Sequence, residues 1–265
     1  MSKTLFCTLL FILTISPLYA ADRERPLTGK FSLMPKIGTD FTVGGAFVKA
    51  SKISETLTLG SSSITADISS DSQDFDDVYH NPISTGLCLN YGLTDFSEVF
   101  INLGYLKAES EEFDGATIDV GGSFGGATVS ASETITAEFD DYHETSLNIG
   151  MRHFFNRFGS LSPFVSIEGG VKHTEKIELE LSIANESISE ITFYDESWTP
   201  NFGTGVGVML EIKDNISFMV ETGLHYDFEL NEDDTDWRGG EDYEDVNDGG
   251  ERWSVPLMFS LRISL

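Results

Sequence analysis

The end of the chain alternates strictly between apolar positions and polar or small ones. Every second residue is apolar, in the order Trp253, Val255, Leu257, Phe259, Leu261, Ile263 and Leu265. Because successive side chains of a β-strand point to opposite faces, this period predicts a strand with one apolar face. The run is longer than an ordinary soluble strand of about 5–6 residues. It suits a tilted membrane-spanning strand of about 9–11 residues together with its ends.

Seven earlier segments show the same period. They span residues 30–43, 83–93, 99–106, 145–155, 163–173, 202–212 and 216–228. Gly, Ser and Asn are frequent at the positions opposite the apolar ones. Small polar residues suit the narrow lumen of an eight-stranded barrel, whose interior is just filled by side chains. We therefore predict an all-β protein, an eight-stranded antiparallel up-and-down transmembrane β-barrel.

The connections between these segments alternate in length. Residues 94–96, 156–162 and 213–215 form the short ones, and residues 49–81, 108–142, 174–197 and 229–251 form the long ones. Transmembrane barrels of bacteria have short periplasmic turns and longer extracellular loops. The alternation in length therefore predicts which end of the barrel faces outward.

The long connections contain alternating stretches of their own. Residues 55–59 face 64–68, residues 176–182 face 188–194, and residues 116–120 and 127–139 alternate as well. These stretches predict extended extracellular hairpin loops that continue the barrel strands beyond the membrane. Such a sheet has an edge, and an exposed edge can pair with a strand of a partner.

Four aromatic residues occupy matching positions where strands would descend from the long loops. They are Tyr79, Tyr142, Trp198 and Trp253. Tyr and Trp are enriched at the two interfaces between a membrane and water. We predict that these four residues form an interfacial aromatic girdle.

The N-terminus indicates export. Met1 to Lys3 carries one positive charge, an apolar run follows to about Ile15, and Pro17 precedes Ala20. This order is typical of a secretory signal peptide, and the run is too short for a spanning helix of roughly 20 residues. We expect a signal peptide over residues 1–20, cleaved after Ala20, and a barrel domain over residues 21–265. The mature chain then keeps one cysteine, Cys88, so the fold must be stable without an internal disulfide.

The net charge of −28 excludes nucleic acid as a partner, since phosphate binding needs a basic patch. Charged residues also fall on the lumen face of the predicted strands: Lys36, Arg152, Glu168, Lys172, Glu211, Glu221, His225 and Arg262. On the lipid face, an Arg or Lys at mid-depth would cost about 2–4 kcal/mol. Inside the barrel, opposite charges can pair across the lumen. We expect a structural network of ion pairs that closes the lumen to solutes; a gate or a proton path is the functional alternative.

The loops carry residues of the types that catalysis and metal binding use. His80 and His143 each follow a Phe-Asp-Asp sequence, and a histidine beside acids can serve as a catalytic base. Matching strand-start chemistry explains the repeat better, so we expect no enzymatic activity. The stretch from Asp245 to Gly250 begins like a calcium loop, but its twelfth position is Pro256 instead of a carboxylate. We expect no cofactor and no dedicated metal site, with at most weak binding of divalent cations by the acidic loops.

Three features make the chain resemble the small outer-membrane β-barrel family of the OmpA/OmpX type. They are Asn90 to Asp95 at the first short turn, Ser162 to Val165 at the start of the fifth strand, and the alternating last strand. That strand is also similar to the signal read by the barrel assembly machinery, although it ends on Leu265 where the family usually has Phe. The resemblance implies the cell outer membrane of a Gram-negative bacterium. Because the chain stops at the eighth predicted strand, we expect it to lack the periplasmic domain of full OmpA proteins.

The fold does not decide the function, because this family includes structural proteins, adhesins and enzymes. We expect a monomeric, non-enzymatic protein, in contact with outer-membrane lipid and lipopolysaccharide, that contributes to envelope integrity or surface interaction through its acidic loops. The alternatives are an adhesin or host-factor-binding protein, an outer-membrane enzyme acting on lipid or peptide, and a narrow solute pore.

Overall fold

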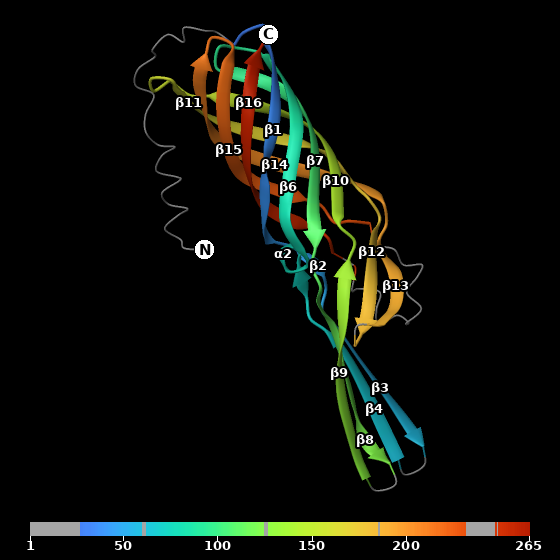
Figure 1. Cartoon of the computed structure of the whole chain (residues 1–265). Helices are drawn as coiled ribbons and strands as arrows, with labels where there is room; N and C mark the ends of the chain where they lie inside the picture. The colour runs from blue at the N-terminus through green and yellow to red at the C-terminus, as the bar shows by residue number, and fades with distance from the viewer. Residues whose placement is uncertain (1–26, 60–61, 125–126, 185, 232–246, 248) are drawn as a thin grey trace.

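The computed structural model describes residues 27–59, 62–124, 127–184, 186–231, 247 and 249–265. Eight antiparallel strands close into a barrel in the order β1-β16-β15-β14-β11-β10-β7-β6 (Figure 1). Their bounds are β1 Phe31–Gly44, β6 Tyr79–Gly92, β7 Ser97–Ser110, β10 Tyr142–Phe154, β11 Leu161–Thr174, β14 Ser197–Lys213, β15 Ile216–Asp227 and β16 Arg252–Ser264. The first and last strands pair along their length and close the barrel. The predicted fold is confirmed.

Alternation along each strand separates an apolar outside from a polar inside. On β10, Leu147, Ile149 and Met151 are exposed on the outer surface, whereas Asn148 and Arg152 are buried in the lumen. The predicted strands were placed correctly but several were too short at the loop end. For example, β14 begins at Ser197 instead of residue 202. The strands run past the apolar belt because backbone pairing continues into the mouth of the barrel.

The turn between β6 and β7 is held by the segment that precedes β1. Thr28 forms a bridge with Gly92, and its hydroxyl donates a hydrogen bond to Asp95 at 2.6 Å. A Cβ atom on Gly92 would lie 1.9 Å from the carbonyl oxygen of Leu27. Glycine at this position therefore allows the N-terminal segment to close the short-turn end of the barrel.

The three hairpins predicted in the long loops form, and they join into one sheet. Its six strands follow the order β13-β12-β9-β8-β4-β3 and are β3 Ser51–Leu59, β4 Ser62–Ser70, β8 Phe113–Phe124, β9 Ala127–Phe139, β12 Ile177–Ile183 and β13 Glu186–Tyr194. Pairing of β4 with β8 and of β9 with β12 connects hairpins from different loops. Four of the strands, β3, β4, β8 and β9, extend away from the barrel (Figure 1).

Two short strands and one helical turn lie between the barrel and this sheet. They are β2 Ala46–Val48, β5 Gln73–Asp74 and α2 Phe75–Val78. Their apolar residues belong to a core that we call the mouth cap, made of Phe47, Val48, Phe75, Val78, Tyr79, Leu106, Ala108, Ala137, Phe139, Tyr142, Ile177, Leu179, Phe193 and Tyr194. The mouth cap joins the barrel strands to the six-stranded sheet.

No helix in the described part of the chain is long and apolar enough to span a membrane.

Candidate functional site

The lumen near the short turns is closed by charged side chains that we call the inner layer: Glu98, Arg152, Glu221 and Arg262. Arg152 on β10 donates to Glu98 of β7 at 2.6 Å and lies 3.4 Å from Glu221 of β15. Arg262 of β16 reaches the second oxygen of Glu98 at 2.7 Å. The side chains of Arg152 and Glu98 are 0% exposed. Four strands are thus linked across the lumen by pairs that exclude water.

Aromatic rings surround the inner layer. The guanidinium of Arg152 lies 4.9 Å from the ring centre of Phe100 and 5.0 Å from that of Phe164. A delocalised guanidinium is attracted to the face of an aromatic ring. Met34, Cys88, Phe154, Met209 and Met219 fill the same region of the lumen. The ion pairs and the apolar packing together fill this part of the lumen.

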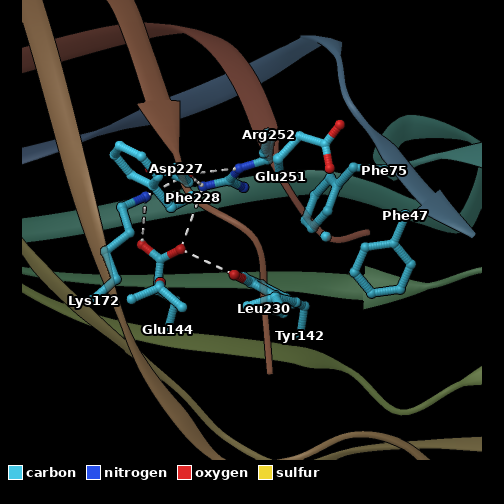
Figure 2. Close-up of a pocket in the computed structure, with 12 residues that line it drawn as sticks. Phe47, Phe75, Tyr142, Glu144, Lys172, Asp227, Phe228, Leu230, Glu251 and Arg252 are labelled. Carbon is cyan, nitrogen blue, oxygen red and sulfur yellow. Dashed lines mark hydrogen bonds and ion pairs between the residues drawn. The ribbon is translucent and has the colours of Figure 1, made fainter. Parts of the chain in front are cut away.

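A second group of charges closes the other end, and we call it the mouth layer: Asp40, Glu144, Lys172, Asp227 and Arg252. Figure 2 shows Lys172 and Arg252 converging on Asp227 and Glu144. Lys172 lies 2.7 Å from Asp227 and 3.0 Å from Glu144, and Arg252 lies 2.8 Å and 3.4 Å from the same two carboxylates. Asp227 and Glu144 therefore each have two cationic partners, which offsets the cost of burying these charges.

The mouth layer is in contact with the mouth cap. Arg252 lies 4.8 Å from the ring centre of Phe75, and the hydroxyl of Tyr142 donates to Glu144 at 3.0 Å. The pocket drawn in Figure 2 has a volume of about 10 Å³, which is room for about one water molecule. The mouth of the barrel is thus filled by aromatic rings on the side of the six-stranded sheet and by ion pairs on the side of the lumen.

A cavity of about 70 Å³ separates the two layers. Lys36, Glu168 and His225 line it together with Glu144 and Lys172 of the mouth layer. The imidazole Nε2 of His225 lies 3.5 Å from a carboxylate oxygen of Glu168. The cavity can hold only a few water molecules, and its polar lining suits them. By their positions along the strands, its lining residues lie between the inner layer and the mouth layer.

The eight predicted lumen residues do not form a single network. Arg152, Glu221 and Arg262 belong to the inner layer, and Lys172 belongs to the mouth layer. Lys36, Glu168 and His225 line the cavity between them. Glu211 pairs with Arg157 at 2.7 Å, apart from both layers. Arg152, Glu221, Arg262 and Lys172 thus lie in two separate levels of ion pairs, and the structural role expected for these residues stays a prediction.

The sequence reasoning missed five members of the layers: Asp40, Glu98, Glu144, Asp227 and Arg252. Asp40 and Asp227 were placed on the polar face but not among the pairing charges. Glu98, Glu144 and Arg252 lie just outside the strand bounds that the alternation predicted. Extending the same period by one or two residues would have placed them in the lumen, because they share a face with Phe100, Ser146 and Ser254.

The predicted aromatic girdle is wrong for two of its four residues. Tyr79 and Tyr142 are buried in the mouth cap. Tyr142 shares the lumen face with Glu144, and a register shift between His80 and Ile83 turns Tyr79 inward. Trp198 and Trp253 are 65% and 43% exposed on the outer surface, as a girdle requires.

The histidines considered for catalysis have separate partners. His80 pairs with Glu111 at 2.9 Å, and Nδ1 of His143 lies 2.8 Å from the hydroxyl of Tyr105. These contacts join neighbouring strands, as ordinary surface pairs do. Residues 245, 246 and 248 of the calcium-like stretch lie outside the described residues.

A group of three acidic residues lies at the start of the helical turn α2. Carboxylate oxygens of Asp74, Asp76 and Asp77 lie within 4.8 Å of one another. Burial raises the pKa of Asp74 above its ordinary value, and the charges of Asp77 and Asp76 raise it further. The backbone N–H of Asp74 donates to Asp77 at 2.9 Å, so one of these carboxylates already serves the local backbone. Grouped acids of this kind are common without a bound ion.

A closed eight-stranded barrel with apolar side chains outside and ion pairs inside is the architecture of a transmembrane outer-membrane barrel. The solved structures similar to this chain include Neisserial surface protein A, at 11% identity over 88% of this chain and 96% of that one, with a TM-score of 0.43. They also include OprG from Pseudomonas aeruginosa, at 12% identity over 92% and 99%, with a TM-score of 0.37. The outer membrane protease OmpT from Escherichia coli matches at 11% identity over 92% and 99%, with a TM-score of 0.42.

No family model and no curated protein matches the chain. The assignment of the fold therefore rests on the closed strand order and on the alternation along its strands.

Proposed function

We propose that the chain is a non-enzymatic outer-membrane barrel, closed to solutes, that serves as an anchor for a sheet used in surface interaction. The apolar outer surface of the barrel supports a place in the membrane, because unpaired backbone and polar side chains are costly in hydrocarbon. The signal peptide expected at residues 1–20 supports export, and barrel assembly machinery is the expected route of insertion. The lumen provides no route for a solute.

The observation that carries the proposal is the contrast between a filled lumen and a large projecting sheet. Both charge layers and the mouth cap close the barrel, so transport does not explain the structure. Six strands instead pair in a separate sheet, and four of them extend away from the barrel. The cost of ordering this chain outside the membrane favours a role for the sheet in contacts with other molecules.

The acidic charge of the loops affects how the protein would contact lipopolysaccharide and divalent cations. Lipopolysaccharide phosphates would repel them unless divalent cations bridge the two, and screening over about 8–10 Å does not remove this repulsion at close range. We expect calcium or magnesium to strengthen any contact at the cell surface. A ligand bound by the sheet remains an additional expected partner.

The test removes the projecting sheet while keeping the barrel. One variant replaces residues 51–70 with a short turn, and a second replaces residues 114–135, leaving Ala137 and Phe139 in the mouth cap. Folding is checked by the different gel migration of boiled and unboiled samples, and exposure is checked by protease treatment of intact cells.

Cell adhesion and envelope permeability are then compared with and without a chelator. The proposal expects adhesion to fall in both variants while permeability stays at the wild-type level. A change in permeability alone would favour a purely structural barrel, and loss of neither property would contradict the proposed role of the sheet. Hydrolysis of lipid or peptide that disappears on replacing His80 and His143 with alanine would favour the enzyme alternative.

A further inference from the structure

The projecting part of the sheet has two chemically different faces. The register pairs Leu57 with Ile64, Ile68 with Ile118, and Val120 with Ala131. Because side chains alternate along each strand, these residues share one aliphatic face, which also includes Val129 and Ile135. The opposite face carries hydroxyl groups, among them those of Thr56, Thr65, Thr117, Thr128, Ser130 and Ser132.

The aliphatic face continues without a break from the mouth cap. Ala137 and Phe139 follow Ile135 on the same side of β9, and Phe139 pairs with Leu179 of β12. This near part is buried, with the ring of Phe139 5.1 Å from that of Phe47. In the distal part Leu57 is 62% exposed and Val129 is 49% exposed. Within the described residues, one half of a continuous apolar face is covered and the other half is not.

The rest of the chain does not suit the uncovered half. Residues 232–246 are rich in Asp and Glu, and placing their carboxylates on an aliphatic surface would carry a high desolvation cost. The undescribed positions at the strand tips are single residues or pairs, and residues 1–20 are the expected signal peptide. A covering surface with matching chemistry has to come from another molecule.

The placement of charge on this face indicates the kind of molecule. Among the described side chains of the face, the charged one is Glu133, on strand β9 at the side of the projecting part. The central strands β4 and β8 contribute Ile64, Ala66, Ile68, Ile118 and Val120. An apolar centre with charge at the rim is the usual composition of a protein–protein interface.

We propose that this face is the contact between two copies of the chain in the same membrane. A two-fold axis along the membrane normal brings the two aliphatic faces together, and two such sheets pack about 10 Å apart. Glu133 of each copy then remains at the rim in water. This inference goes beyond the proposed function, and it departs from the monomer expected from the sequence.

The size of the face agrees with a weak dimer. Residues 63–69 of β4 pair with residues 117–123 of β8. At about 3.3 Å per residue and 4.8 Å between strands, four strands of this length present roughly 450 Å² per copy. Two copies would bury about 900 Å² in total, which is in the range of weak, transient interfaces. Confinement in a membrane fixes the orientation of the copies and raises their effective concentration, so a contact of this size can form reversibly.

The first experiment compares two cysteine variants of the full mature chain in liposomes. Ile118→Cys places a thiol on the aliphatic face, and Thr117→Cys places one on the hydroxyl face of the same strand. Cys88 is buried in the lumen and stays in both variants. A bismaleimide of about 10 Å, matched to the spacing of packed sheets, should yield a covalent dimer from Ile118→Cys and only background from Thr117→Cys. Equal yields from both variants, or no dimer from either, would overturn the proposal.

A second measurement does not depend on cross-linking. Energy transfer in liposomes between chains labelled at the N-terminus with donor and acceptor dyes should show a dimer for the wild type and for Thr117→Glu, and a loss of dimer for Ile118→Glu. All three must first show the gel migration of a folded barrel. A wild-type chain that stays monomeric at all concentrations overturns the proposal. So does quenching of a dye at position 118 of the Ile118→Cys variant by brominated lipid, which would assign the face to lipid.

Discussion

The inner layer and the mouth cap close the same barrel by different physical means. The inner layer uses buried ion pairs, centred on Arg152, between side chains that point inward from the barrel wall. The mouth cap uses aromatic rings and aliphatic side chains, many of them contributed by the long loops, such as Phe47 and Phe193. A buried ion pair contributes little net stability compared with apolar packing, but removing one partner is very costly. Apolar packing stabilises in proportion to the area buried. The inner layer should therefore determine the integrity of the barrel, and the mouth cap should determine the integrity of the sheet.

The largest expected effect comes from Arg152→Ala. The substitution removes one of the two arginine partners of Glu98, and it removes the arginine that pairs with Glu221, in a dry environment. We expect the free energy of unfolding of the barrel to fall by about 3–5 kcal/mol, measured by urea titration in detergent. The control is Arg157→Ala, which breaks a pair with Glu211 that is partly exposed to solvent. That control should cost about 0–1 kcal/mol, and equal effects of the two variants would contradict the importance of the inner layer.

The second prediction concerns the mouth cap. Phe139 contacts the rings of Phe47, Tyr79, Phe113 and Phe193. Phe139→Ala should destabilise the packing of the sheet on the barrel by about 3–5 kcal/mol, the usual cost of truncating a buried Phe. Protease should then cleave the projecting strands while the urea midpoint of the barrel stays unchanged. A single shifted transition for barrel and sheet would show that the two regions unfold together.

The third prediction tests closure of the lumen directly. In planar bilayers the wild-type chain should show no sustained ohmic channel, since both charge layers and the mouth cap block the path. Phe139→Ala should remain closed as well, because the inner layer does not depend on the mouth cap. Large sustained currents from the wild type would refute the closed lumen, and currents from Phe139→Ala alone would show that the mouth cap is the main barrier.

The smallest expected effect is a pH dependence at the loop end of the barrel, where Lys107 of β7 pairs with Asp141. The ammonium of Lys107 lies 2.7 Å from Asp141, and this hydrogen bond lowers the pKa of Asp141 below its ordinary value of 3.8. A lowered pKa means that the pair stabilises the fold above about pH 4 and that this contribution is lost as the pH falls through the lower value. Both side chains are more than a third exposed, so water screens the pair and the effect on the free energy of unfolding should be small. Asp141→Asn should lower the urea midpoint slightly at pH 7 and by less at pH 3, and an equal loss at both values would contradict the assignment.

The sequence predicted the barrel because each strand repeats one physical rule many times. Alternation over residues 253–265 identifies the outer and inner side of β16 without any knowledge of its neighbours. The same rule placed Arg152, Lys172, Glu221 and Arg262 in the lumen. It failed for Tyr79 because the register shift before Ile83 reverses the face, and a single shifted residue leaves no mark in the pattern.

The hairpins of the loops were also predictable, but their union was not. Residues 55–59 and 64–68 show their pairing through a local turn. Pairing of β4 with β8 joins residues of different loops, and two strands of similar composition do not specify each other in the sequence. The mouth cap could not be predicted for the same reason, since Phe47, Phe75 and Phe193 become neighbours only when the loops that carry them meet.

The sequence by itself determined the class of fold, which face of each strand is apolar, and the inward position of most lumen charges. These features depend on the period of a strand and on the cost of placing a charge in lipid. Only the tertiary structure decided which charges pair, that they form two layers with a cavity between them, and that three loops build one sheet with half of its apolar face uncovered. The physical reason is distance along the chain. Alternation is a local property, whereas pairing across a lumen or between loops depends on the register and closure of the whole barrel.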